Sequence, residues 1–202
     1  YLCSEKVQSE DGAYRSKGTH YTAVIYPAKS MLELVAAERG LIGSPLWKER
    51  YVRHKESAER AIDDLLLRLD NIQTEGDMTF EDGMITCSAL QLALRALLEG
   101  DSARRERYTS AAAYLMGKHQ CLEQQLIPDC RMRGGTLRYW EALDVYFVPN
   151  QVMNSPHGWT AWKIYACYYL YLLTGEVRYL SDFMDTLGAC AQFMELNGHL
   201  RW

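Results

Sequence analysis

The chain has 202 residues, of which 48% are hydrophobic and 24% are charged, and its formal net charge is −4. These values are those of an ordinary globular domain that can bury a core. The mild acidity and the lack of a basic run or a finger motif argue against nucleic acid as a partner, and no uninterrupted apolar stretch reaches the roughly 18 residues of a membrane span.

The first part of the chain predicts an arm followed by two helices. Residues 1–26 are polar and lack hydrophobic periodicity, so we expect an N-terminal arm or capping loop before one helical domain over 27–202. Pro27 suits the start of a helix, and the apolar spacing that follows predicts a helix over 28–39. Two glycines end it, and a Ser-Pro pair opens a second helix over 46–69.

Four further helices are expected after a polar break at 71–77, because apolar residues recur there at helical spacing. The irregular segment 127–154 interrupts them and is expected to be partly helical within 137–147. These helices are predicted over 84–99, 102–126, 159–173 and 177–194. The fold class is therefore predicted to be all-α, with about six helices in antiparallel hairpins.

The residues that end one expected helix and open the next form a pattern that repeats along the chain. An apolar helix end, a glycine and an Arg-Tyr pair that opens the next helix occur around Gly100 and again around Gly175. This recurrence predicts stacked helical hairpins, an array that uses one end or one face for binding. The two copies are Arg107-Tyr108-x-Ser110 with Gly117, and Arg178-Tyr179-x-Ser181 with Gly188, and Arg50-Tyr51 is a looser third copy.

The six cysteines show no C-x-x-C pair and no metal-ligand spacing, so no metal is expected, and without a P-loop or a dinucleotide fingerprint no organic cofactor is expected either. Cys87, Cys167 and Cys190 lie in apolar helical runs and are expected to be buried thiols. The sequence does not decide whether Cys121 and Cys130 form a disulfide bond. The 14 tyrosines and 5 tryptophans, against 4 phenylalanines, fit either sugar-stacking surfaces or helix–helix seams near the surface.

Several short segments of the sequence resemble those of one family of helical domains. Phe80-Glu81-Asp82-Gly83 opens one expected helix, Asn154-Ser155-Pro156-His157-Gly158-Trp159 opens another, and Trp159-x-x-Trp162 and Tyr171-Leu172-Leu173-Thr174-Gly175 follow. Over 27–196 the chain resembles the (α/α) toroids of the six-hairpin glycosidase-like kind, found in glycoside hydrolases and polysaccharide lyases. The hairpins are therefore expected to stack as a toroid-like array.

The resemblance implies a carbohydrate substrate, and a location in the periplasm or outside the cell. It covers about half the helices of a complete toroid. The chain is therefore expected to be one part of a longer protein, a small open array or a subunit of a homo-oligomer.

Glycoside hydrolysis needs one carboxyl group that protonates the leaving oxygen and one that is ionised. In toroids of this kind the N-terminal ends of the inner helices line the cleft, so the resemblance places Glu81 and Asp82 near substrate. Adjacent side chains point in different directions, and Glu141 and Asp144 are the candidates for a distant partner. The acidic pair can instead stabilise the first turn of its helix.

A polysaccharide lyase is the first alternative. It needs Asn or Arg to neutralise a uronate carboxylate and His or Tyr to remove the acidified proton. Asn154 and His157 would then form the centre, although a histidine in a first helical turn also serves as a local hydrogen-bonding group. The residues expected to bind sugar are Arg131, Arg133, Tyr139, Trp140, Asn154 and Trp159.

A non-catalytic helical repeat that binds a protein or a glycan is the second alternative. It would keep its function after the loss of any single carboxylate. In every case His119, in the middle of a helix, is expected to be structural. The favoured interpretation is a glycoside hydrolase that acts on a polysaccharide or a uronic-acid-containing oligosaccharide.

Overall fold

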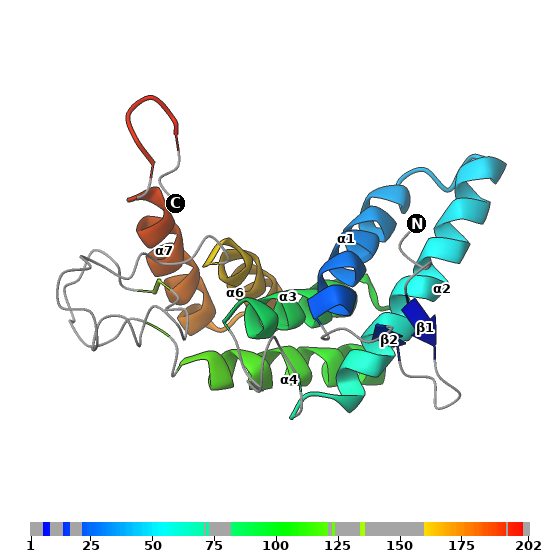
Figure 1. Ribbon diagram of the computed structural model, residues 1–202, viewed down its shortest axis with the longest axis horizontal. Helices are drawn as coiled ribbons and strands as arrows, with labels where there is room; N and C mark the ends of the chain where they lie inside the picture. The colour runs from blue at the N-terminus through cyan, green and yellow to red at the C-terminus, as the bar shows by residue number, and fades with distance from the viewer. Residues whose placement is uncertain are drawn as a thin grey trace.

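The computed structural model (Figure 1) describes residues 6–8, 14–16, 22–70, 72, 82–120, 123, 134–135, 160–192 and 194–199. Its helices are α1 (Thr22–Glu38), α2 (Pro45–Leu67), α3 (Asp82–Leu98), α4 (Ser102–His119), α6 (Thr160–Thr174) and α7 (Val177–Ala191). A small antiparallel ribbon pairs β1 (Lys6–Gln8) with β2 (Tyr14–Ser16). The predicted all-α class is confirmed, with one described helix at each of the six expected places.

The first helix begins earlier than the sequence predicts. It starts at Thr22, so Pro27 lies in its second turn and the expected boundary between arm and domain falls inside α1. Val24 and Ile25 are buried in the core. The burial of two large apolar side chains outweighs the hydrogen bond that a proline cannot donate.

The described helices form three antiparallel hairpins, α1–α2, α3–α4 and α6–α7. The first helices of the hairpins pack side by side, with α3 between α1 and α6 (Figure 1). The helix α4 lies along α3 and also reaches α6, and α7 packs on α6. The row is open, with α2 and α7 at its two ends, and the described helices do not close into a ring.

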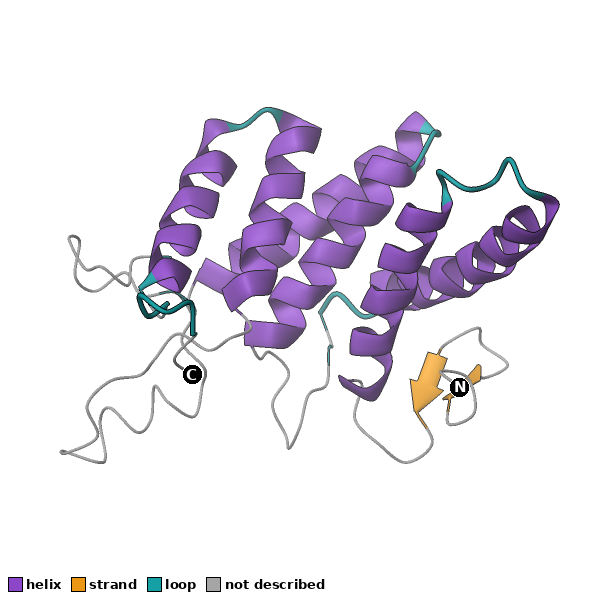
Figure 2. Cartoon of the chain, turned by 90° about the horizontal axis from the view of Figure 1, so that it is seen from above, coloured by secondary structure: helices purple, strands orange, loops and turns teal. Residues whose placement is uncertain are grey.

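The two ends of the hairpins differ. Short turns at 39–44, 99–101 and 175–176 join the helices of each hairpin at one end (teal, Figure 2). Gly175 has a φ of +70°, which glycine adopts without strain, and its N–H donates to the carbonyl of Tyr171 at 2.8 Å. The opposite end, named here the connection end, holds the N-terminal ends of α1, α3 and α6 and the C-terminal ends of α2, α4 and α7.

The helix α3 forms the centre of the core. Its residues from Met84 to Ala96 are buried, although several of them are polar. The side-chain nitrogen of Gln91 donates to the carbonyl oxygens of Ile25 at 3.0 Å and Cys87 at 3.3 Å. Because a buried amide needs such partners, this contact fixes the register of α1 against α3.

In both close copies of the Arg-Tyr repeat the tyrosine is buried and its hydroxyl contacts an arginine. Tyr108 on α4 and Tyr179 on α7 are both buried. The hydroxyl of Tyr108 accepts a hydrogen bond from Arg104 at 3.1 Å, and that of Tyr179 accepts one from Arg178 at 3.0 Å. Each guanidinium also lies over the ring of its tyrosine. The tyrosine is the shared element, and the arginine reaches it from a different position in each copy.

Two of the three expected buried thiols are confirmed. Cys87 and Cys167 are free and buried, and burial raises the pKa of each thiol to about 12. Cys190 is half-buried, and burial raises its pKa as well. Such thiols behave as small apolar side chains rather than as nucleophiles. Cys121 and Cys130 lie outside the described residues.

A buried carboxylate joins the two helices of the first hairpin. Glu38 on α1 is buried, and each of its two carboxylate oxygens lies 2.9 Å from Nδ1 of His54 on α2. We expect His54→Ala to lower the free energy of unfolding by about 2 kcal/mol, because a charged group in the core loses this partner. Urea denaturation measures the loss. The double variant Glu38→Gln/His54→Ala should regain part of it, and a double variant no more stable than His54→Ala would contradict this explanation.

Candidate functional site

A network of buried charged and polar groups lies at the connection end, where α4, α6 and α7 meet described pieces of the segment between α4 and α6. Its centre is Lys163, in the first turn of α6, whose side chain is only 1% exposed. A lysine is almost never buried this completely without a partner. We name the whole set the Lys163 network, and it consists of His119, Glu123, Gly134, Lys163, Asp182 and Thr186.

Two acceptors hold the ammonium group of Lys163. Its Nζ lies 3.0 Å from Oε1 of Glu123 and donates to the carbonyl oxygen of Gly134 at 2.9 Å. Thr186 on α7 donates to the same carbonyl at 3.1 Å. The same carboxylate oxygen, Oε1 of Glu123, also lies 3.1 Å from Nδ1 of His119. Residues 123 and 134 are thereby tied to three helices.

Gly134 occupies a place that no other residue can fill without strain. Its φ is +77°, and an added Cβ would lie 2.8 Å from the backbone nitrogen of Thr186 and 3.0 Å from the backbone carbon of Asp185. These are atoms of a helix and cannot turn aside as a flexible side chain can. The close approach brings the Gly134 carbonyl within reach of both of its donors.

The two carboxyl groups near Lys163 have pKa values displaced in opposite directions. Burial works against ionisation of Glu123, but the hydrogen bond from His119 and the charge of Lys163 outweigh it and bring the pKa down to about 2. Burial raises the pKa of Asp182 against the pull of Lys163, and the charge of Glu123 raises it further. One ionised and one more readily protonated carboxyl group are what acid–base chemistry at a glycosidic bond requires.

His119 is the neutral member of the network. Burial lowers the pKa of its imidazole, although the Glu123 carboxylate acts in the opposite direction. Because an ionised carboxylate only accepts hydrogen bonds, Nδ1 carries the proton and donates to Glu123. Among the described residues, its Nε2 has no hydrogen-bond partner. The side chain thus orients Glu123, in line with the structural role expected from its position in the helix.

Nearly all residues that the sequence singles out for catalysis and sugar binding lie outside the described residues. Asp82 is the exception: it is the first residue of α3, at the connection end, and only its backbone is described. The described residues therefore neither bring the expected set together nor separate it. The others are Glu81, Arg131, Arg133, Tyr139, Trp140, Glu141, Asp144, Asn154, His157 and Trp159.

Lys163 was not predicted from the sequence, although a signal for it is present. Lys163 is the only charged residue of α6, a helix otherwise rich in apolar and aromatic residues. A lone charge in such a helix needs a buried partner. No comparable signal marks Glu123 or Asp182, because their environment depends on helices that are distant in the sequence.

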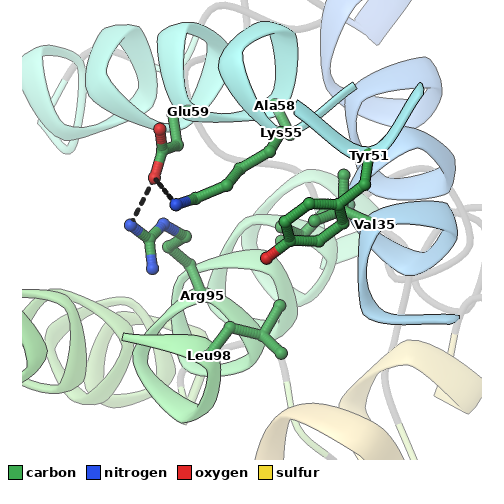
Figure 3. Close-up of a pocket in the computed structure, with 8 residues that line it drawn as sticks. Val35, Tyr51, Lys55, Ala58, Glu59, Arg95 and Leu98 are labelled. Carbon is green, nitrogen blue, oxygen red and sulfur yellow. Dashed lines mark hydrogen bonds and ion pairs between the residues drawn. The ribbon is translucent and has the colours of Figure 1, made fainter. Parts of the chain in front are cut away.

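A second polar cluster lines a shallow cleft between α1, α2 and α3 (Figure 3). Buried Arg95 pairs with Glu59 at 2.7 Å, and Lys55 reaches the same carboxylate at 3.8 Å. Tyr51, from the third Arg-Tyr pair, lines the cleft beside them. The Arg95–Glu59 pair holds α2 against α3, and the described residues that line the cleft include none of those expected to be catalytic.

Known proteins offer no guide to either cluster. No protein-family model, curated protein or solved structure matches the chain. Within the described ranges, no helix is long and apolar enough to cross a membrane. No group of three or more His, Cys, Asp or Glu side chains in that part of the chain could hold a metal ion. The Lys163 network is therefore the feature of the chain on which a function can be based.

The buried imidazole makes stability depend on pH. Since burial lowers the pKa of His119 in the folded state, the unfolded chain binds a proton more readily, and stability falls as the pH drops below about 6.5. Ionised Glu123 and the charge of Lys163 face the ring. We expect His119→Asn, whose amide keeps a donor for Glu123 but does not titrate, to lose less stability between pH 7 and pH 5. Denaturant titrations at several pH values measure this, and equal losses in both proteins would contradict it.

The steric role of Gly134 gives a second prediction. Gly134→Ala should lower the free energy of unfolding by at least about 1 kcal/mol, because the new methyl group meets the backbone of α7 at a positive φ. Gly117→Ala is the matched control, since a Cβ at Gly117, within α4, meets nothing within 4 Å. Thermal and urea denaturation of both variants give the comparison. A Gly134→Ala protein as stable as the control would show that the close approach is not required.

Proposed function

We propose that this chain is a carbohydrate-active protein that hydrolyses glycosidic bonds at the connection end. The observation that carries the proposal is a pair of carboxyl groups that both sense the charge of Lys163 and each other, of which Glu123 lies 3.0 Å from its Nζ. Glu123 is held ionised, and Asp182 takes up a proton more readily than a free aspartate does. Hydrolysis by general acid and base needs two such groups with separated pKa values.

The direction of the helices supports an anionic sugar as substrate. The N-terminal ends of α1, α3 and α6 all lie at the connection end. Each N-terminal end carries a partial positive charge and free backbone N–H groups. The C-terminal ends of α2, α4 and α7 at the same end carry the opposite partial charge, so a carboxylate of a uronic-acid-containing polysaccharide or oligosaccharide would bind at the N-terminal end of a single helix.

Besides supplying the carboxyl pair, the Lys163 network would support the rest of the site in this proposal. Gly134 is fixed against α7, and Arg131 and Arg133 immediately precede it in the sequence. Anchoring of the chain at this point would limit where two guanidinium groups can bind sugar carboxylates. The carboxylates of Glu81, Asp82, Glu141 and Asp144 remain proposed acid–base partners in the same reaction.

The test is an activity screen of the 202-residue chain on a panel of neutral and uronic-acid-containing polysaccharides. Hydrolysis releases new reducing ends, whereas β-elimination by a lyase also creates an unsaturated sugar that absorbs in the ultraviolet. We expect new reducing ends without this absorbance. Absorbance would overturn the hydrolase in favour of the lyase centred on Asn154 and His157, and the lack of any product from folded protein would overturn both.

Variants then assign the reaction to the carboxyl pair. We expect Asp182→Asn to lower kcat by about a hundredfold or more, because a general acid or base typically contributes at least that much. Asp185→Asn is the matched control, since Asp185 lies on the same helix and is also half-buried. Equal activities of the two variants would exclude Asp182. Glu81→Gln and Glu141→Gln, measured in parallel, decide whether those carboxylates share the role.

A helical-repeat binding domain is the second candidate, and one observation favours it. The α6–α7 hairpin exposes large apolar residues, including Tyr165, Leu172 and Met184. Surfaces of this kind commonly bind other proteins. A folded chain that lacks activity but keeps its affinity for a glycan or a protein after substitution of any single carboxylate would support this candidate.

A further inference from the structure

The cleft between α1, α2 and α3 has the composition of a small binding site (Figure 3). It lies toward the turns of the hairpins, away from the connection end, because Val35 lies in the last turn of α1 and Leu98 ends α3. The cleft measures about 260 Å³ when the space at its open mouth is counted. Its floor is apolar, since Leu32, Val35 and Ala58 are each at most 4% exposed. We name it the Arg95 cleft, after the buried charged side chain that lines it.

Arg95 keeps one buried donor without an acceptor. Its side chain is 5% exposed, and a single nitrogen, Nη2, donates to both Glu59 at 2.7 Å and Glu99 at 2.6 Å. The Nε–H group is buried and has no hydrogen-bond partner among the described residues. Burying an unpaired donor is costly, so such a group commonly marks the place of a water, an ion or a ligand.

Two further donors line the same cleft. Lys55 extends from α2 toward Arg95, and its Nζ lies 3.8 Å from Oε1 of Glu59, which is too far for a hydrogen bond (Figure 3). The hydroxyl of Tyr51 likewise has no hydrogen-bond partner in the part of the chain that the structure describes. Three donors from two helices thus border one apolar floor, which is the usual make-up of a ligand site.

The charges around the cleft select the kind of ligand. Glu59 pairs with Arg95 and Lys55, and Glu99 pairs with Arg95 and Arg104. These ion pairs join three cations to two carboxylates, so the cluster carries one positive charge in excess. A monoanion compensates this charge, whereas a dianion such as phosphate would be repelled by the two carboxylates. The apolar floor favours a hydrocarbon part over a sugar.

We propose that the Arg95 cleft binds a small organic monocarboxylate. The carboxylate would accept hydrogen bonds from Arg95, Lys55 and Tyr51, and the hydrocarbon part would lie on the apolar floor. Guanidinium and ammonium groups form strong, charge-assisted hydrogen bonds with a carboxylate. The cleft and the carboxyl pair proposed for hydrolysis lie at opposite ends of the hairpins, so this inference does not rest on the proposed function.

Titration of the full chain with acetate, butanoate and benzoate, followed by heteronuclear NMR, tests the proposal. The Nε–H group of an arginine gives its own signal, so Arg95 reports binding directly. We expect butanoate and benzoate to shift this signal and to bind more tightly than acetate, because only they reach the apolar floor. Benzamide, the uncharged counterpart of benzoate, should leave the signal in place. The proposal would be overturned if no carboxylate shifts the signal, if benzamide binds as tightly as benzoate, or if inorganic phosphate binds more tightly.

Variants at the rim of the cleft separate binding from folding. Lys55→Gln should weaken benzoate binding about threefold, the effect of one ion pair near the surface, and Tyr51→Phe should weaken it by removing only a hydroxyl group. Both side chains are partly exposed, so neither substitution opens the core.

Lys48→Gln is the matched control, since Lys48 is an exposed lysine of α2 that does not line the cleft. It should bind benzoate as the unaltered chain does, and circular dichroism confirms that each variant keeps its helices. An unchanged affinity in both cleft variants, or an equal loss in the control, would overturn the proposal.

Discussion

The burial of α3 on all sides is the constraint on which the rest of the structure depends. A helix that is covered all round needs neighbours in several directions, and α1, α4 and α6 supply them. Small residues such as Ala89, Ala93 and Ala96 let these neighbours approach closely. The hairpins stack as a row because each first helix packs beside the next, and α3 lies in the middle of that row.

The same constraint decides where polar groups are tolerated. A buried amide or cation has to find its partners within the protein, so Gln91 bonds to the backbone of α1 and Arg95 pairs with Glu59 and Glu99. Lys163 obeys the same rule at the connection end, but its partners are residues 123 and 134 of the segment between α4 and α6. A charge that is costly to bury thereby fixes residues 123 and 134 against the helices.

Local features of the sequence were sufficient to predict the helices. Hydrophobic spacing and the glycine stops predicted all six described helices. The start of α1 differed because the burial of Val24 and Ile25 extends the helix beyond a proline, and α4 ends at His119 instead of at residue 126. The Arg-Tyr repeat identified two buried tyrosines but not their partners. The Lys163 network could not be predicted in the same way, because its members come from four separate parts of the chain and meet only after α6 and α7 have packed.

The sequence by itself determined the fold class, the hairpin order and the place of the turns, because these depend on residues within one helix or on the few that separate two helices. Only the tertiary structure decided which polar groups share a site. The low pKa of Glu123, the raised pKa of Asp182 and the need for a glycine at residue 134 all arise from distances between helices. Such distances depend on how the whole row packs, and the periodicity of the sequence does not predict them.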